Sequence, residues 1–252
     1  MPEYLELVPL MSLSENVATL VAEMTKALIG ACSIALFLAP AASVAGAPAG
    51  RGFSARVTNP WYPLKPGTTY VYKGVKDGQP SRELMVVTPE TKRIHGAPCA
   101  VVKDRLYLHG RLEERTTDWY SQDRQGNVWY FGESTAQLDK HGKVTSTEGS
   151  WQAGRNGAQA GIFMPGHPRI GQSGRQEYYK GHAEDHFQVL RFHVSVKVPY
   201  TSSRKALLTK EWTPLEPAVL DHKYFLRGVG NVLEQSAKGA NERNALVSFR
   251  RG

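Results

Sequence analysis

Cysteine is scarce in this chain, and motifs for a catalytic nucleophile are missing. Its two cysteines are Cys32, which lies in an apolar run near the N-terminus, and Cys99. If the apolar run is removed, Cys99 stands alone and no intramolecular disulfide can form. Its apolar neighbours favour a buried thiol over a nucleophile. No Gly-x-Ser-x-Gly elbow, His-Glu-x-x-His, Cys-x-x-Cys or phosphate loop occurs, which lowers the expectation of an enzyme.

Sustained helical periodicity is also absent, as are basic runs with interleaved aromatic residues. The second absence argues against nucleic acid as a partner. The formal net charge is nevertheless +8. A basic exported protein tends to lie near anionic surfaces such as phospholipid head groups or wall polymers, although solubility alone would also explain the charge. We expect no cofactor and a monomeric protein.

The N-terminal residues predict export. Lys26 precedes an uncharged run over residues 27–49, and Ser43-Val44-Ala45 offers the small residues that a signal peptidase accepts. We therefore expect a signal peptide over residues 24–45 and a location outside the cell or on the exterior of the envelope. Two alternatives are weaker. Pro40 disfavours a membrane anchor, although the run is long enough for one, and the lipobox-like sequence around Cys32 lies inside the apolar run.

Residues 1–23 do not fit a signal peptide, because they hold four glutamates and no lysine or arginine. We interpret them as an overrun upstream of a translation start at Met24. Cleavage after Ala45 would leave 207 residues, and the loss of one cation and four anions would raise the net charge to +11. This length suits one β domain over residues 61–252, preceded by a loose, disordered leader over residues 46–60.

Short runs of β-branched and aromatic residues, separated by turn residues, predict an all-β fold. The spacing is typical of a sandwich or barrel. We expect strands over residues 68–75, 81–88, 99–108, 112–123, 127–133, 143–150, 175–179, 186–198, 205–213, 220–226, 232–236 and 246–250. Residues 152–171 are rich in glycine and proline and predict a long loop.

Two hairpins can be assigned a register. A two-residue turn at His109-Gly110 would set Leu108 opposite Arg111. The same register would form two charge pairs, Arg105 with Glu114 and Asp104 with Arg115.

In the second hairpin, a turn closed by Asp123 and Asn127 would set Ser121 opposite Trp129. Continued without interruption, this register would pair Trp119 with Phe131 and Thr117 with Glu133. Both faces of the hairpin would then carry aromatic residues, so one must pack the core and the other must be covered or bind a ligand.

Three motifs resemble those of an uncharacterised group of bacterial exported proteins. They are Pro-Leu-Lys-Pro-Gly-Thr-Thr-Tyr-Val-Tyr over residues 63–72, the second hairpin over residues 118–133, and the segments 223–225 and 228–234. The resemblance spans residues 59–234. It implies a single-domain antiparallel meander that forms a half-open or closed barrel, loosely similar to lipoprotein carriers and lipocalins, and it implies no reaction.

Aromatic residues give the first candidate site. Tyr70 and Tyr72, together with Trp119, Trp129, Phe131 and Trp151, could line a cavity in a curved sheet. We expect ligand contacts from Trp119, Trp129, Phe131, Glu133 and Trp151. An ordinary filled core would explain the same aromatic residues equally well.

Two polar sets give further candidates. His182, Glu184, Asp185 and His186 are of metal-ligand types, although a solvated loop is the simpler interpretation. The glutamates Glu133, Glu177, Glu211 and Glu216 stand beside aromatic residues, where a carboxyl group could serve as a general acid. Pairing with Lys210 or Lys223, or exposure to water, would also explain them.

These observations favour an exported barrel-like protein that binds an apolar or amphipathic small molecule. An extracellular enzyme that depends on a metal or on carboxylates is the alternative. A third possibility is a cationic protein that interacts with an anionic polymer of the cell surface.

Overall fold

The computed structural model describes residue 50 and residues 52–252, and every regular element there is a β-strand. The strands are β1 (Thr69–Lys76), β2 (Gln79–Ile94), β3 (Ala97–Leu108), β4 (Arg111–Gln122), β5 (Val128–Leu138), β6 (Val144–Ser146), β7 (Trp151–Gln152), β8 (Gln159–Met164), β9 (Ser173–Arg175), β10 (Glu177–Tyr178), β11 (His186–Lys197), β12 (Ser202–Trp212), β13 (Leu220–Leu226), β14 (Gly230–Lys238) and β15 (Arg243–Arg250). This part of the chain contains no helix long and apolar enough to cross a membrane.

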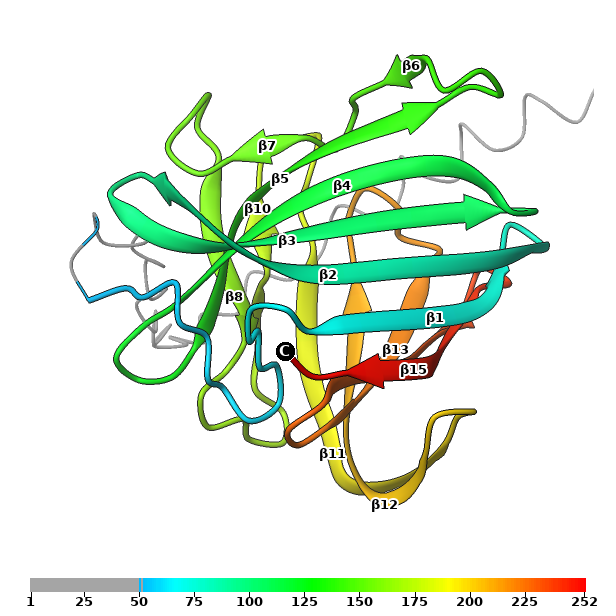
Figure 1. The fold of residues 1–252 in the computed structure, drawn as a ribbon. Coiled ribbons are helices and arrows are strands. Elements are labelled where there is room, and N and C mark those ends of the chain that lie inside the picture. Colours follow the sequence, from blue (N-terminus) through cyan, green and yellow to red (C-terminus); the bar gives the residue numbers. More distant parts are fainter. Residues whose placement is uncertain (1–49, 51) are drawn as a thin grey trace, which may run out of the picture. The chain divides into compact units, whose positions relative to one another are not determined.

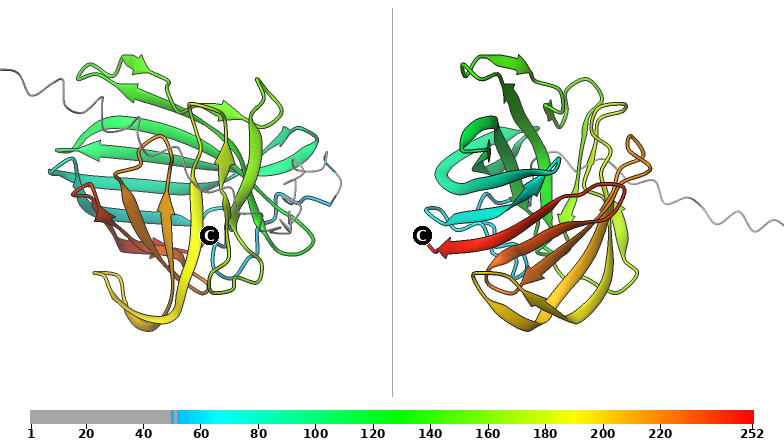
Figure 2. Two further views of the ribbon diagram at one scale, coloured as in Figure 1. Left: turned by 180° about the vertical axis from the view of Figure 1, so that it is seen from behind. Right: turned by 90° about the vertical axis from the view of Figure 1, so that its right-hand side faces the viewer.

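The strands of this domain form an antiparallel sheet that curves into a nearly closed barrel (Figure 1, Figure 2). Their order is β10-β8-β5-β4-β3-β2-β1-β15-β14-β13-β12-β11-β9, and the short strands β6 and β7 also pair with β5. Pairing of β1 with β15 joins the first and last strands in the middle of the sheet. The predicted all-β antiparallel barrel is therefore confirmed, with one seam left unsealed.

A short stretch of chain bridges this seam. β9 pairs with β11 at one edge of the sheet, and β10, which follows after Gln176, pairs with β8 at the other edge. Between them, the Gln176 backbone N–H donates to the Asp185 carbonyl at 2.7 Å. The two edges are therefore held together although no ladder joins β9 to β10.

β8 corrects the prediction of a long loop over residues 152–171. It pairs with β5 through Trp129 and Ile162, and it carries Phe163 toward the interior. Gly161 is the reason that the sequence pattern did not indicate this strand. A Cβ at Gly161 would lie 2.4 Å from the Arg175 carbonyl oxygen. Glycine is required here because two backbones approach closely.

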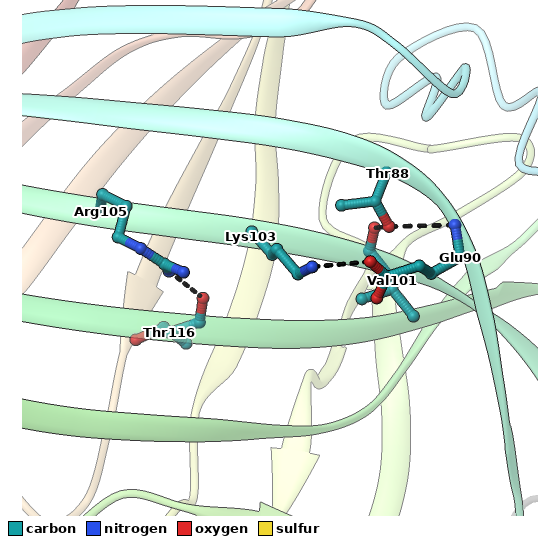
Figure 3. A network of polar contacts seen from close by, with 6 residues as sticks. All are labelled: Thr88, Glu90, Val101, Lys103, Arg105 and Thr116. Carbon is teal, nitrogen blue, oxygen red and sulfur yellow. Dashed lines mark hydrogen bonds and ion pairs between the residues drawn. The ribbon is translucent and has the colours of Figure 1, made fainter.

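β2 bends sharply where it contains two extra residues. Val87 pairs with Val102, but the next pair of the ladder joins Thr91 to Ala100. The Thr88 hydroxyl contributes two hydrogen bonds at this bulge, to the Val101 carbonyl at 2.9 Å and from the Glu90 N–H at 3.2 Å (Figure 3). Bulges of this kind increase curvature, which helps the sheet to close.

A second bulge lies in the β3–β4 hairpin. The predicted pairing of Leu108 with Arg111 is confirmed, but Leu106 lies opposite Glu114 because Glu113 is an extra residue in β4. One inserted residue moves every later side chain of the strand to the opposite face of the sheet. Glu114 consequently shares a face with Leu106, and both side chains line the barrel interior.

The two charge pairs predicted for this hairpin are wrong for the same reason. Arg105 lies opposite Arg115, and Asp104 lies opposite Thr116. The Arg105 guanidinium donates to the Thr116 carbonyl at 3.3 Å instead of meeting Glu114 (Figure 3).

A third bulge interrupts the β4–β5 hairpin. Ser121 lies opposite Trp129, as predicted, but beyond the bulge Asp118 lies opposite Glu133. The predicted pairing of Thr117 with Glu133 is therefore wrong. The bulge turns Glu133 to the face that Asp118 occupies, and both side chains line the interior.

Gly132 makes the third bulge possible. Its φ of +131° lies where residues with a side chain are strained. A Cβ at this position would also lie 2.3 Å from the Trp151 carbonyl oxygen. The close approach of β7 and the unusual backbone angle both require glycine here.

Within the leader predicted over residues 46–60, residues 53–60 pack against the barrel. Ser54 exchanges backbone hydrogen bonds with Gln122 on β4, each of 2.9 Å. The Phe53 ring packs edge-on against Trp129 at 5.9 Å and Phe131 at 5.2 Å. This segment therefore covers an aromatic face that would otherwise be exposed.

Asn59 fixes the end of this segment. Its side-chain amide donates to the carbonyls of Gly126 and Pro165, at 2.8 and 3.0 Å. Its side-chain oxygen accepts from the N–H groups of Trp61 and Tyr62, at 2.8 and 3.2 Å. Asn59 is buried, so these four bonds satisfy groups that water does not reach.

Candidate functional site

The barrel encloses a cavity of about 380 Å³. Side chains from β1–β5, β8, β10 and β12–β15 line it. It extends toward one end of the barrel, where the β1–β2, β3–β4 and β14–β15 turns lie. The pairing of Val75 with Arg243 and of Ser81 with Leu108 places these three turns at the same end.

Acidic and basic residues are unequally distributed between the cavity and the rest of the protein. Among residues 52–252, eleven of the 19 acidic residues line the cavity, but only three of the 29 basic residues do. The acidic residues are Glu83, Asp104, Glu114, Asp118, Glu133, Glu177, Asp185, Glu211, Asp221, Glu234 and Glu242. A basic protein therefore has a markedly acidic interior.

Four rings form an aromatic cluster in the wall of the cavity: Tyr62, Tyr120, Tyr130 and Phe163. Tyr120 stacks on Tyr130 at 4.8 Å, and Tyr62 lies 4.5 Å from Phe163. Burial raises the pKa of each of these three tyrosines well above its usual value. Their hydroxyls therefore stay protonated and can donate hydrogen bonds.

Asp118 and Glu133 lie beside the aromatic cluster. The Tyr130 hydroxyl donates to Asp118 Oδ1 at 2.7 Å. Burial nevertheless raises the pKa of Asp118 to about 7, because the hydrogen bond offsets only part of the desolvation. Burial, Asp118 and Glu177 together raise the pKa of Glu133 well above its usual range. The two facing carboxyl groups therefore do not both ionise readily near neutral pH.

Glu177 is positioned by Trp151. The indole Nε1 donates to Glu177 Oε2 at 2.6 Å, and both residues are buried. Burial and the nearby Asp185 raise the pKa of Glu177 to about 8, although the indole hydrogen bond opposes the shift. A carboxyl group of this kind can give or accept a proton near neutral pH.

Lys223 places an ammonium group inside the barrel. Its Nζ lies 2.7 Å from Glu211 and 3.5 Å from Glu234, and 6.0 Å from the centre of the Phe163 ring. Burial lowers the Lys223 pKa, but the two glutamates outweigh it and the net shift is upward. Burial raises the pKa of Glu234 to about 7, partly offset by Lys223.

Near the turn end of the cavity, hydrogen-bond acceptors gather from four strands. Asn244 Nδ2 donates to Glu83 across β1, where Gly74 has no side chain. Burial and the adjacent Glu83 raise the pKa of Asp104 well above its usual range. Asn244 Oδ1 and the Ser236 hydroxyl are buried without a hydrogen-bond partner among the described residues. We call Glu83, Asp104, Ser236 and Asn244 the acceptor cluster.

The five predicted ligand residues fall in different places. Glu133 lines the cavity, and Trp151 lies behind Glu177. Trp119, Trp129 and Phe131 alternate along their strands with residues that line the cavity, and they lie on the opposite face. There Phe53 packs against Trp129 and Phe131, and Lys92 Nζ lies 3.3 Å from the centre of the Trp119 ring.

The four predicted metal ligands are not brought together. His182 Nδ1 lies 2.8 Å from Glu148, and Glu184 accepts from the Gly181 N–H. His186 stacks on Trp212, and Asp185 points into the cavity. Within residues 52–252 no group of three or more His, Cys, Asp or Glu side chains is arranged to hold a metal ion.

Three of the four glutamates proposed as general acids do line the cavity: Glu133, Glu177 and Glu211. Most of the other cavity residues were missed by sequence reasoning. A period-two pattern of Glu114, Thr116, Asp118 and Tyr120 on β4 marks the inner face, and this signal was available in the sequence. As a whole, the site offers carboxylates and phenols beside aromatic faces, which suits ligand binding or proton transfer.

The sequence matches no protein-family model and no curated protein. Two solved structures are similar in fold. One is a Bacteroides fragilis protein, provisionally described as an exported protein with a YmcC-like fold, with 13% identity, a TM-score of 0.45, and coverage of 76% of this chain and 99% of its own. The other is provisionally described as a lipoprotein from Parabacteroides distasonis, with 10% identity, a TM-score of 0.41, and coverage of 75% and 98%.

Proposed function

We propose that this protein is an exported binding protein that holds a small amphipathic molecule inside its barrel. The observation that carries the proposal is a cavity of about 380 Å³ that combines an aromatic cluster with carboxylates from opposing strands. Pockets that bind small molecules pair apolar walls with a few polar groups that fix orientation. A wholly apolar ligand would leave buried carboxylates without donors, which is costly, so an amphipathic ligand is favoured over an apolar one.

A matched pair of substitutions on β2 tests this proposal. Ser81 lines the cavity and its neighbour Arg82 is exposed, so Ser81→Trp should obstruct the interior while Arg82→Trp should leave it open. Phenethyl alcohol, phenethylamine and 3-phenylpropionate are small enough for the cavity and share one apolar group. Calorimetry should show saturable binding of at least one of them, and this binding should be lost in Ser81→Trp alone.

Export is part of the proposal, and the predicted signal peptide lies outside the described residues. Protein secreted by a bacterial host should begin near Gly46 when its N-terminus is sequenced. Intact Met1 on protein found in the cytoplasm would contradict export. Because 26 of the 29 basic residues within residues 52–252 do not line the cavity, we also propose an anionic envelope polymer as a surface partner.

A second candidate is a glycoside-cleaving enzyme. Asp118 lies opposite Glu133 within an enclosed site, and the pKa of each is raised. A general acid paired with a second carboxylate is the arrangement that such enzymes use. Turnover of any member of a panel of p-nitrophenyl glycosides, lost in both Asp118→Asn and Glu133→Gln, would support this candidate.

A further inference from the structure

The acceptor cluster has few donors of its own, namely the Asn244 amide and the Ser236 hydroxyl. Glu83 accepts from Asn244, and the half-buried Asp104 has the carboxyl group of Glu83 as its side-chain hydrogen-bond partner. The buried oxygens of Asn244 and Ser236 are also without a partner in the described part of the chain. Buried polar groups are nearly always hydrogen-bonded. Such a wall fits a ligand that donates several hydrogen bonds from one point.

The barrel already accommodates a group of this kind. Lys223 Nζ lies between Glu211 and Glu234 and near the face of Phe163, so one ammonium group is held by carboxylates and an aromatic ring in this interior. An ammonium group has three donors and no acceptor. Its hydrogen bonds to carboxylates are charge-assisted, and aromatic faces add a cation–π attraction.

We infer that the ligand of this cavity is an organic cation whose ammonium group lies among Glu83, Asp104 and Glu114, with its apolar part directed toward the aromatic cluster. This inference rests on the proposed function and gives the charge of the ligand. An anion would meet the carboxyl groups of Glu83, Asp104 and Glu114, which outnumber the two cations that line this end, Lys76 and Arg243. A neutral alcohol could offer only one donor from its hydroxyl group, and that bond would not be assisted by charge.

The three phenethyl compounds test the inference, since they share the apolar part and differ in the polar end, which is neutral, cationic or anionic. At pH 8, phenethylamine should bind at least tenfold more tightly than phenethyl alcohol, and 3-phenylpropionate should bind least. Asp104→Asn and Glu114→Gln should each weaken phenethylamine at least fivefold and leave phenethyl alcohol within twofold. The control Glu113→Gln alters the neighbouring side chain, which pairs with Arg111 outside the cavity, and should change neither affinity.

The outcomes separate the two claims. If none of the three compounds binds, the proposed function and the inference both fail. If the alcohol or the carboxylate binds as tightly as the amine, and Ser81→Trp abolishes that binding, the proposed function stands and the inference is overturned. Equal affinity of phenethylamine for the wild type, Asp104→Asn and Glu114→Gln would also overturn the inference. Circular dichroism of each variant confirms that it has folded.

Discussion

Glu133 lies directly opposite Asp118 across the β4–β5 ladder, although an uninterrupted register would place it opposite Thr117. The bulge at Gly132 causes this change. A similar bulge turns Glu114 to the inner face of β4. Two irregularities of the sheet thus add two carboxyl groups to the cavity.

The first prediction concerns Gly132. Gly132→Ala should lower the free energy of unfolding by about 2 to 4 kcal/mol, because the new Cβ meets the Trp151 carbonyl and the backbone angle is strained. Gly110→Ala is the control, since Gly110 also has a positive φ but nothing lies within 4 Å of its Cβ position. That variant should lose only about 1 kcal/mol. Equal losses in urea denaturation would show that the contact with β7 is unimportant.

Stability should fall as pH rises from about 4 to 8. The native pKa values of Asp118 and Glu177 are about 7 and 8, above those of the unfolded chain, so the folded state binds more protons in this range. The protonated carboxyl groups therefore contribute to the free energy of unfolding at low pH, and this contribution is lost as pH rises through the native pKa values. Urea denaturation at several pH values measures this slope.

The groups around these two carboxyls determine the shift. Asp118 faces the Tyr130 hydroxyl, Glu83 and Glu114, and Glu177 faces Trp151, Asp185, Asp118 and Lys223. Asp118→Asn and Glu177→Gln keep an acceptor for Tyr130 and Trp151 but cannot ionise. Each variant should be more stable than the wild type at pH 8 and should flatten the slope. The exposed control Glu90→Gln should leave it unchanged. A free energy of unfolding that increases with pH over this range would contradict the raised pKa values.

Removal of the buried ammonium should destabilise the barrel. Lys223→Met leaves Glu211 and Glu234 without their cation, and breaking a buried pair in this way costs about 3 to 5 kcal/mol. The loss should be smaller at pH 5, where the glutamates can take up protons. Lys210→Met is the control on the neighbouring strand, because Lys210 does not line the cavity. A loss that does not depend on pH would point to packing instead of charge.

Asn59 should be important for closing one end of the domain. Asn59→Ala removes four hydrogen bonds and leaves the carbonyls of Gly126 and Pro165 without this donor. We expect a loss of about 2 to 4 kcal/mol in the free energy of unfolding. The exposed Asn241→Ala should change it little. Similar midpoints for both variants in urea would contradict the role given to Asn59.

The fold could be predicted from the sequence because local patterns determine it. Alternating residues and turn signals located most of the strands, and the turns at His109-Gly110 and Asp123 set the first pairs of two hairpins correctly. The charge pairs of Arg105 and Asp104 failed because register beyond a bulge depends on contacts distant in sequence. Gly132 shows the reason most clearly, since the approach of β7, which is one of the two causes that require glycine there, is not visible in the local sequence.

The same limit explains why the site was predicted only in part. Glu133 was identified by its aromatic neighbours, but the aromatic face expected to line the cavity is the one that Phe53 covers. The acceptor cluster joins residues of β2, β3, β14 and β15, which no local pattern connects. It forms only because β1 pairs with β15 and closes the barrel around it.

Proton release on binding tests the central claim most directly. Phenethylamine remains protonated at pH 7, so any net proton exchange must come from the protein. Calorimetric titrations at pH 7 in two buffers with different ionisation enthalpies give the number of protons exchanged. A cation bound beside Asp104, whose pKa is raised by burial and by Glu83, should release protons into the buffer, and Asp104→Asn should release fewer. Binding of the amine with no proton release, or with proton uptake, would contradict the account.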